Sequence, residues 1–435
     1  MNEPHPVGLV VEDDYRRSRL TVLLRLILGI PHYVWLFLWT ILAIVVTVIN
    51  WFATLIFGRP PSWAHRFLCA YIRYGVHLSA YMFLVADPYP GFMGEAGSYP
   101  IDVSLPDEPQ RQNRWKTLFR LILAIPAYLI GGVLGGGFGV SVSILFNRSG
   151  VSRRPSRFNG GGLSGGGVLV AVCAVLGWFA SLFTGRMPTG LRDAGAYGVG
   201  YNAQLRAYGL ILTDRYPNSD PLALLEAVPR PAQHPVHLVG EAQDLRRSRL
   251  LVLFRLPLFF PHYVWLSLWG IAVFFVSIFN WFATLIMARP PRPTYRFVSR
   301  YIRYQFHVYA FVTVAANPFP GFTGLAGSYP LDLVIPDEPQ RQNRWKTLFR
   351  LILVIPAFIV SFGVYFLLLF TSMLTWFASL IRGSAPWGLR NTMAYGLRYF
   401  AQTNAYLYLV TDAYPHASPL EGADPILESA DTLAA

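Results

Sequence analysis

The sequence is poor in cysteine and in charge of either sign. Its 435 residues include only two cysteines, Cys69 and Cys173, each within an apolar stretch. Neither a disulfide framework nor a cysteine-based metal site is therefore supported. Charged residues make up 14% of the chain, against 54% hydrophobic and 15% aromatic residues. This composition argues against a string of soluble domains and is typical of an integral membrane protein.

Enzyme motifs are also missing. No HExxH motif or P-loop occurs, and the nine histidines are scattered. The GxSxG match at 162–166 lies in a glycine-rich stretch with no strand before it, which argues against a nucleophile elbow. The glycine-rich segment 131–139 lacks the strand–turn–helix context of a dinucleotide site. We therefore predict no enzymatic activity, no catalytic or metal-binding residue and no cofactor.

Long uncharged runs are present instead. Residues 31–57 and 261–287 contain no Lys, Arg, Asp or Glu, and each run exceeds the roughly 20 residues needed to cross a bilayer. The first apolar stretch of the chain begins only near Leu20, after an acidic segment. It is too long for the apolar region of a cleavable signal peptide, so none is expected. The net charge of +13 is attributed to arginines at the ends of spans, so no nucleic-acid partner is predicted.

One pattern recurs four times along the chain, and such internal repeats decide the architecture. Each copy has a Trp-Phe pair, a proline ten residues after the Trp, and a D/N-x-Y/F-P phrase thirty-six residues after it. The Trp residues are Trp51, Trp178, Trp281 and Trp376, and the phrases open at Asp87, Asp214, Asn317 and Asp412. The predicted repeats are 1–98, 99–228, 229–328 and 329–418, followed by a disordered tail, 419–435.

A second level of repetition joins the repeats in pairs. Repeats one and three resemble each other, as do repeats two and four. The stretch PDEPQRQNRWKTLFRLIL is identical at 106–123 and 336–353. The sequence therefore predicts an A–B pair that has been duplicated.

Each repeat opens with a short alternating segment that predicts a β-strand, at 7–13, 99–108, 234–241 and 329–338. An arginine-bearing amphipathic stretch, a long span and a second helix of about 20–25 residues follow. The predicted fold is an all-α integral membrane bundle of about eight transmembrane helices, arranged as four helical hairpins, with the strands forming a small extramembrane layer. In this arrangement all strands and both termini lie on one face, and cytoplasmic termini are favoured because the repeated arginines lie at the span entrances.

Repeat two contains a glycine-rich insertion at 136–167. Such a sequence predicts a flexible loop. Alternatively, residues 127–147 re-enter the membrane or cross it separately, and an extra crossing would invert the second half, as in inverted-repeat transporters.

An Arg-x-x-Arg-x5-Arg pattern precedes every long span. These arginines are predicted to bind anionic lipid headgroups or an acidic partner. The alternative is that they anchor the span ends and pair with acids such as Asp107, Glu108, Asp337 and Glu338. The twelve residues are Arg16, Arg19, Arg25, Arg111, Arg114, Arg120, Arg246, Arg249, Arg255, Arg341, Arg344 and Arg350.

A second candidate site lies within the second helices of the odd repeats. Arg73 and His77, and likewise Arg303 and His307, lie four residues apart and so share one helix face. Ionisable groups at membrane depth are functional-site hypotheses by default. The predicted partners are Asp87 and Asp214, or tyrosines such as Tyr74 and Tyr81. The alternative is a purely structural buried network.

The segments IPHYVWLFLWTILAIVVTVINWFATLIFGRPP (30–61) and AYLYLVTDAYP (405–415) resemble the bacterial membrane family known as domain of unknown function 4389. The resemblance extends over nearly the whole chain as four tandem copies. It implies a two-helix module in a bacterial plasma membrane and brings no activity, catalytic residue or ligand. The chain departs from the pattern at the glycine insertion and at Asn317, Ala288 and Ser384.

These observations lead to a multi-pass protein of the bacterial inner membrane that is a non-enzymatic scaffold or accessory subunit. It is expected to contact anionic lipid and a membrane-protein partner. The alternative is a transporter or channel with a polar pathway at the pseudo-two-fold axis between repeats one and three. The oligomeric state is left open.

Overall fold

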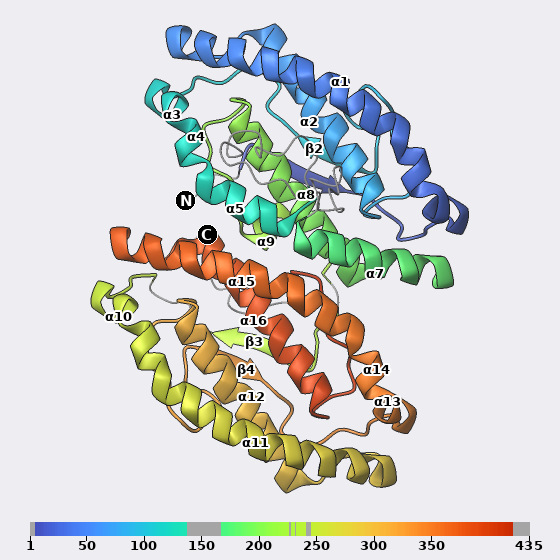
Figure 1. Ribbon diagram of the computed structural model, residues 1–435, viewed down its shortest axis with the longest axis vertical. Helices are drawn as coiled ribbons and strands as arrows, with labels where there is room; N and C mark the ends of the chain where they lie inside the picture. The colour runs from blue at the N-terminus through green and yellow to red at the C-terminus, as the bar shows by residue number, and fades with distance from the viewer. Residues whose placement is uncertain (1–4, 137–166, 226–227, 231, 241–244, 421–435) are drawn as a thin grey trace, which may run out of the picture. The chain divides into compact units, whose positions relative to one another are not determined.

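A computed structural model describes residues 5–136, 167–225, 228–230, 232–240 and 245–420. The predicted disordered tail, apart from 419–420, and most of the glycine-rich insertion lie outside these residues. The chain forms two compact units. Of the described residues, those from 5–218 and 223–228 form the N-terminal unit, and those from 219–222 and 229–420 form the C-terminal unit. Each unit contains one A–B pair of repeats (Figure 1).

Helices dominate both units, and the same order of elements recurs in each. The first half of the chain has β1 (Gly8–Val11), α1 (Arg19–Phe57), α2 (Ser62–Met82), β2 (Ile101–Ser104), α3 (Arg114–Leu118), α4 (Arg120–Leu123), α5 (Ile125–Leu134), α7 (Val168–Thr184), α8 (Thr189–Gly209) and α9 (Pro221–Leu224). The second half has β3 (His237–Gly240), α10 (Arg249–Leu253), α11 (Arg255–Met287), α12 (Arg292–Val312), β4 (Leu331–Val334), α13 (Arg344–Leu348), α14 (Arg350–Leu353), α15 (Ile355–Arg382) and α16 (Trp387–Leu407).

The four predicted strands are present, although each is shorter than its alternating segment. β1 pairs antiparallel with β2, with Leu9 opposite Val103, and β3 pairs with β4, with Leu238 opposite Leu333. In each unit one strand packs on each of the two second helices, β2 on α2 and β1 on α8 in the N-terminal unit. The strands thus join the two repeats of a unit.

Each long helix ends at a left-handed residue, which is the usual role of glycine at this position. Gly58 ends α1 with φ 75°, and its amide donates to the Thr54 carbonyl at 2.8 Å. A proline two or three residues later then precedes the second helix, as Pro61 precedes α2. In repeat three the left-handed residue is Ala288, with φ 56°.

Three helical stretches in the described part of the chain are long and apolar enough to cross a membrane. They are Arg19–Phe57, Arg255–Met287 and Arg350–Arg382. The prediction of about eight spans is therefore not supported in full. The second helices α2, α8, α12 and α16 are long enough at 21 residues each. They lack an uninterrupted apolar surface because arginine, histidine, tyrosine and amide side chains occur throughout them.

The two repeats of a unit run in opposite directions, contrary to the predicted layout with all strands on one face. Arg19 at the start of α1 donates to the Phe183 carbonyl at the end of α7, at 3.1 Å. Reciprocally, Arg114 at the start of α3 donates to the Ile56 carbonyl at the end of α1, at 2.9 Å. The start of each long helix thus lies beside the end of its partner.

The chain inverts because an extended segment runs back along the second helix. His77, near the end of α2, bonds Asp102 at 3.1 Å, whereas His65, near its start, bonds the Pro106 carbonyl at 2.7 Å. Repeat two therefore begins at the opposite end of α2. In the sequence, the two helices of a hairpin indicate a return of the chain to its starting side, and nothing in their pattern indicates that the chain then reverses.

The described ends of the glycine-rich insertion come together. A Cβ atom on Gly135 would lie 2.2 Å from the amide nitrogen of Gly167, so the two backbones are in direct contact. Figure 1 shows α5 and α7 following one another along the same line. Together they take the place of the single long helix of the other repeats. Of the segment 127–147 that was considered for a separate crossing, 127–134 belongs to α5, and 137–147 lies outside the described residues.

Candidate functional site

The last arginine of each triplet is buried within the protein. Arg25 is 2% exposed and donates to the carbonyls of Tyr81 and Ala86 and to the Asp87 carboxylate, the latter at 2.6 Å. Tyr81 lies in the last turn of α2, where helix carbonyls lack intrahelical partners, and Ala86 and Asp87 lie just after the helix. The two carbonyl contacts recur for Arg120, Arg255 and Arg350. In each repeat this arginine fixes the end of the second helix against the start of the long helix.

A strained residue lies at the centre of this contact. Leu84, Ile211, Val314 and Leu409 have positive φ values of 61° to 69°, a conformation that is costly for any side chain and most for β-branched ones. Buried polar side chains donate hydrogen bonds to the carbonyl of the positive-φ residue or to the carbonyl of the residue that follows it. Arg17 donates to Leu84, and Gln112 donates to Ile211 at 2.6 Å. These hydrogen bonds therefore stabilise the strained conformation of the left-handed residue.

The first and second arginines of the triplets differ in exposure from the buried third arginine. Arg16, Arg19, Arg111, Arg114, Arg246, Arg249, Arg341 and Arg344 are all exposed. Arg249 and Arg344 repeat in the C-terminal unit the reciprocal bonds of Arg19 and Arg114, to the carbonyls of Ile381 and Ile286. Among the triplet arginines only these eight are exposed, whereas Arg25, Arg120, Arg255 and Arg350 are buried.

The arginine and histidine residues of the predicted polar site form two separate clusters, one in each unit. Arg73 Nε and His77 Nε2 lie 3.3 and 3.1 Å from Asp102 Oδ1. Arg303 Nε and His307 Nε2 lie 3.5 and 2.7 Å from Asp332 Oδ1. Each histidine also stacks on a tyrosine, His77 on Tyr99 with ring centroids 5.0 Å apart. The clusters attach the returning extended segment to the second helix.

The predicted partners of these clusters were wrong. Asp87 pairs with Arg25 and Asp214 with Arg120, while Tyr74 bonds His32. The true partners, Asp102 and Asp332, lie in β2 and β4. The recurrent YPxD phrase, which puts an acid into an otherwise apolar strand, is the sequence signal that could have identified them.

Both aspartates are held in the charged form. Burial raises the pKa of Asp102, but hydrogen bonds from His77 and from the amides of Gly97 and Val103 outweigh it and hold the pKa below its ordinary value of 3.8. The pKa of Asp332 is lowered in the same way, and the hydrogen bond from His307 is the largest of the effects that oppose burial. A carboxylate that accepts this many hydrogen bonds is well suited to fixing a loop.

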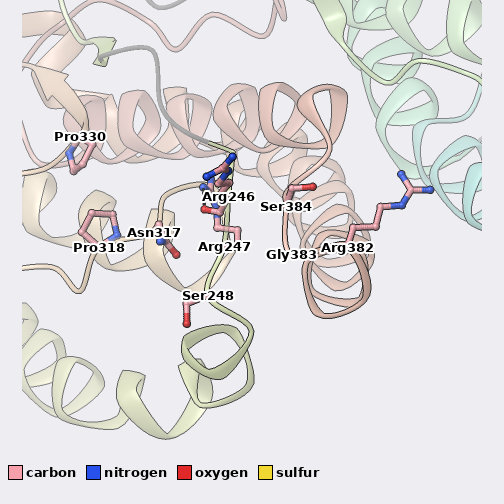
Figure 2. A pocket seen from close by; sticks show the side chains of 9 residues that line it. All are labelled: Arg246, Arg247, Ser248, Asn317, Pro318, Pro330, Arg382, Gly383 and Ser384. Carbon is pink, nitrogen blue, oxygen red and sulfur yellow. Dashed lines mark hydrogen bonds between the residues drawn. The ribbon is translucent and has the colours of Figure 1, made fainter.

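A basic cavity lies at the start of repeat three. It has a volume of about 790 Å³ and is lined by Arg246, Arg247, Ser248, Asn317, Pro318, Pro330, Arg382, Gly383 and Ser384. Figure 2 shows Arg246 and Arg247 between Asn317 and Ser384, whereas the side chain of Arg382 extends away from this group. None of the described lining residues is acidic. The sequence showed the departures at Asn317 and Ser384 but not that they border one cavity.

Within the described ranges, no three His, Cys, Asp or Glu side chains lie close enough together to hold a metal ion. The two cysteines are both buried.

The fold and these contacts define a helical, internally repeated protein with helices apolar enough to cross a membrane. The chain belongs to the family described as Domain of unknown function (DUF4389), whose model matches residues 19–94, 163–219, 249–323 and 344–418. These four matches coincide with the four repeats and cover more than half of the chain. No curated protein and no solved structure matches the chain.

Proposed function

We propose that this protein is a non-enzymatic membrane protein that binds anionic lipid through the exposed arginines of its triplets and acts as a scaffold for a protein partner. The observation that carries the membrane part is the distribution of side chains around α1. The buried face of this helix includes Arg25, His32, Thr40, Asn50 and Thr54 beside four apolar or small residues. It exposes leucine, isoleucine, valine and phenylalanine along its whole length. Polar groups inside and apolar groups outside are what a lipid environment favours.

The lipid preference is argued from charge and aromatic residues. Eight exposed arginines flank the starts of the long helices. Trp115 and Trp345 beside them are 72% and 71% exposed, and indole rings favour the headgroup region of a bilayer. Each basic residue near an anionic membrane surface contributes about 1 kcal/mol. The arginines together therefore supply a clear preference for anionic over zwitterionic lipid.

The scaffold part is argued from the extended segments that return along the second helices. Glu95, Asp107 and Glu108 are exposed on one, and Asp337 and Glu338 on another. These charged surfaces contrast with the apolar surface of α1 and provide a polar face for a partner.

The lipid proposal is tested with the full chain in nanodiscs that mix phosphatidylglycerol with phosphatidylcholine. Bound lipids are then quantified by native mass spectrometry. The triple variant Arg16→Gln, Arg111→Gln, Arg341→Gln is expected to lower the enrichment of the anionic lipid by about 10–100-fold at low ionic strength. The control Arg296→Gln, Arg300→Gln removes exposed charges from α12 and is expected to keep most of the enrichment. Equal enrichment in wild type and the triple variant would refute the proposal.

The transport alternative has no observation in its favour among the described residues. Arg73 and His77 are bonded to Asp102, and Arg303 and His307 to Asp332, each within its own unit. A solute pathway lined by these four side chains would require them to release their aspartates.

A further inference from the structure

Two apolar loops, residues 88–95 and 318–325, follow the second helices of the odd repeats. Each exposes three large apolar side chains, by 39% to 60%. In repeats two and four, residues 214–220 and 412–420 expose only one such side chain each, Tyr216 and Tyr414. The exposed side chains of the apolar loops are Tyr89, Phe92 and Met93 in repeat one and Phe319, Phe322 and Leu325 in repeat three.

Each apolar loop is attached to the first half of a long helix. Trp35 of α1 donates its indole N–H to the Phe92 carbonyl at 2.9 Å. The Phe92 ring stacks on the buried His32, with ring centroids 4.3 Å apart. In repeat three, Trp265 of α11 donates to the Phe322 carbonyl at 3.1 Å. The exposed side chains are therefore held beside α1 and α11.

Each apolar loop also lies directly on the second helix of its repeat. A Cβ atom on Gly94 would lie 2.3 Å from the carbonyl oxygen of Ala70 in α2, and one on Gly324 would lie 2.2 Å from that of Arg300 in α12. Both glycines have positive φ values, 63° and 58°. Only glycine allows the backbone to approach a helix this closely, so each loop is packed on both helices of its hairpin.

The tryptophans of the long helices give the level of these loops along the helix axis. Trp35 and Trp51 are sixteen residues apart in α1, which corresponds to about 24 Å. The residues between them carry no charge, and the same holds between Trp265 and Trp281. This spacing is close to the thickness of about 30 Å of the hydrocarbon core, and indole rings favour its two boundaries. The bond to Trp35 thus holds the loop at the level where one boundary is expected.

The neighbours of Trp35 on α1 extend the same apolar surface. Tyr33, Val34 and Phe37 are 38%, 58% and 58% exposed. The apolar loop therefore adds to the surface through which α1 is proposed to face lipid. This continuity favours lipid rather than a separate protein partner as the occupant.

We propose that each apolar loop inserts into the boundary between headgroups and acyl chains where its own long helix enters the bilayer. The phenylalanine, methionine and leucine side chains contact acyl chains, and Tyr89 lies at the headgroup level. The insertion extends further in repeat three, because Leu325 stands where repeat one has Glu95. This inference rests on the membrane part of the proposed function and adds two non-helical segments to the surface that contacts lipid.

The test uses the full chain in phosphatidylcholine liposomes with a fluorophore on Met93→Cys. Lipids that carry a spin label near the headgroup end of the acyl chain quench a probe in contact with lipid, whereas iodide quenches a probe in water. Wild type is labelled in parallel as a blank, since both native cysteines are buried. Quenching by lipid is expected to exceed quenching by iodide.

Two results at Met93 would overturn the proposal. Stronger quenching by iodide than by lipid would place the loop in water. Protection from both quenchers would show that protein, from a second copy or from this chain, covers the loop.

A matched pair of variants tests the difference between the repeats. Leu325→Cys and Glu95→Cys place the same probe at aligned, exposed positions. Lipid is expected to quench the probe at Leu325 more strongly than iodide does, and the order is expected to reverse at Glu95. Stronger quenching by iodide at both positions would refute the deeper insertion of repeat three.

A probe on Ile44→Cys separates this inference from the proposed function. Ile44 is 56% exposed on α1 and lies nine residues beyond Trp35, or about 13 Å further along the helix. If lipids quench the probe at Ile44 but not at Met93, α1 crosses the bilayer and the loop inference alone is wrong. If lipids quench neither probe, the membrane part of the proposed function is wrong as well. The liposomes contain no anionic lipid, so the result does not depend on the exposed arginines.

Discussion

Arg25 of the N-terminal unit faces the charged Asp87, whereas the aligned Arg255 of the C-terminal unit faces the neutral Asn317. Both arginines are buried and donate to the same pair of backbone carbonyls. The carbonyl contacts are therefore the constant part of the fold, and the counter-charge is the variable part.

A second aligned pair shows the same difference. Arg192 contacts the Tyr15 hydroxyl and lies 3.0 Å from Asp193. Its counterpart Arg390 is 1% exposed, and none of its guanidinium nitrogens has a hydrogen-bond partner in the described structure. The aligned positions of Tyr15 and Asp193 hold Leu245 and Asn391. The C-terminal unit thus keeps this buried arginine without the aligned hydroxyl and carboxylate, and the acid whose charge acts on Arg390 is instead Asp220.

The largest expected effect comes from removing the buried arginine of the first repeat. Arg25→Met removes hydrogen bonds to three acceptors and leaves Asp87 without its cation, so we expect a loss of about 3–5 kcal/mol in unfolding free energy. Arg255→Met leaves no uncompensated charge and is expected to cost about 1–3 kcal/mol. Unfolding in mild detergent, followed by circular dichroism, measures both. Equal losses would show that the Asp87 charge contributes nothing.

The next contrast concerns Arg192 and Arg390. Arg192→Met is expected to destabilise by about 2–3 kcal/mol because it leaves Asp193 near an apolar side chain. Arg390→Met is expected to cost less, about 0–1 kcal/mol, because its guanidinium has no hydrogen bond to lose and only its attraction to the buried Asp220 is removed. The same unfolding assay compares the two variants. A matching loss at Arg390 would reveal a stabilising partner for this side chain.

The aspartates of the two strands predict a dependence on acid. Their folded-state pKa values lie below the ordinary value of 3.8. Their contribution is therefore fully present above that pH and is lost as the pH falls through the folded pKa. We expect thermal stability to fall below about pH 4, by about 1–2 kcal/mol for each aspartate. Asp102→Asn with Asp332→Asn should flatten this fall, and an unchanged slope would contradict the assignment.

The smallest effect is expected at the left-handed residues that end the long helices. Ala288→Gly is expected to stabilise by about 0.5–1 kcal/mol, because glycine adopts φ 56° without strain. Gly58→Ala should destabilise by a similar amount, since a Cβ there meets only ordinary contacts, such as Arg114 Nε at 3.7 Å, and the cost is conformational. Scanning calorimetry of both variants checks the pair. Destabilisation by Ala288→Gly would show that the alanine methyl group makes a contact that outweighs the strain.

Local patterns predicted local structure well. The alternating segments formed strands, the Gly58, Gly185 and Gly383 positions ended helices, and the pairing of repeats appeared as two compact units. Hydrophobicity also found the long apolar helices, because their exposed surface is apolar in every turn. The prediction of about eight spans is supported only in part, because among the described residues only three helical stretches are both long and apolar enough to cross a membrane.

The contacts of the polar residues could not be predicted in this way. Arg25 meets Asp87 across 62 positions, and His77 meets Asp102 across 25. Any of several acids was an equally good partner on charge alone. Only the path of the returning segment decides which one lies within hydrogen-bonding distance.

The sequence by itself determined the fourfold repeat, its duplication as A–B pairs and the apolar character of the long helices, because periodicity and composition are properties of the chain. The tertiary structure decided that paired repeats run in opposite directions, since the reversal depends on an extended segment lying along α2. It also decided that one arginine in each triplet is buried and that Asn317 and Ser384 border one basic cavity, because burial depends on what packs around a side chain.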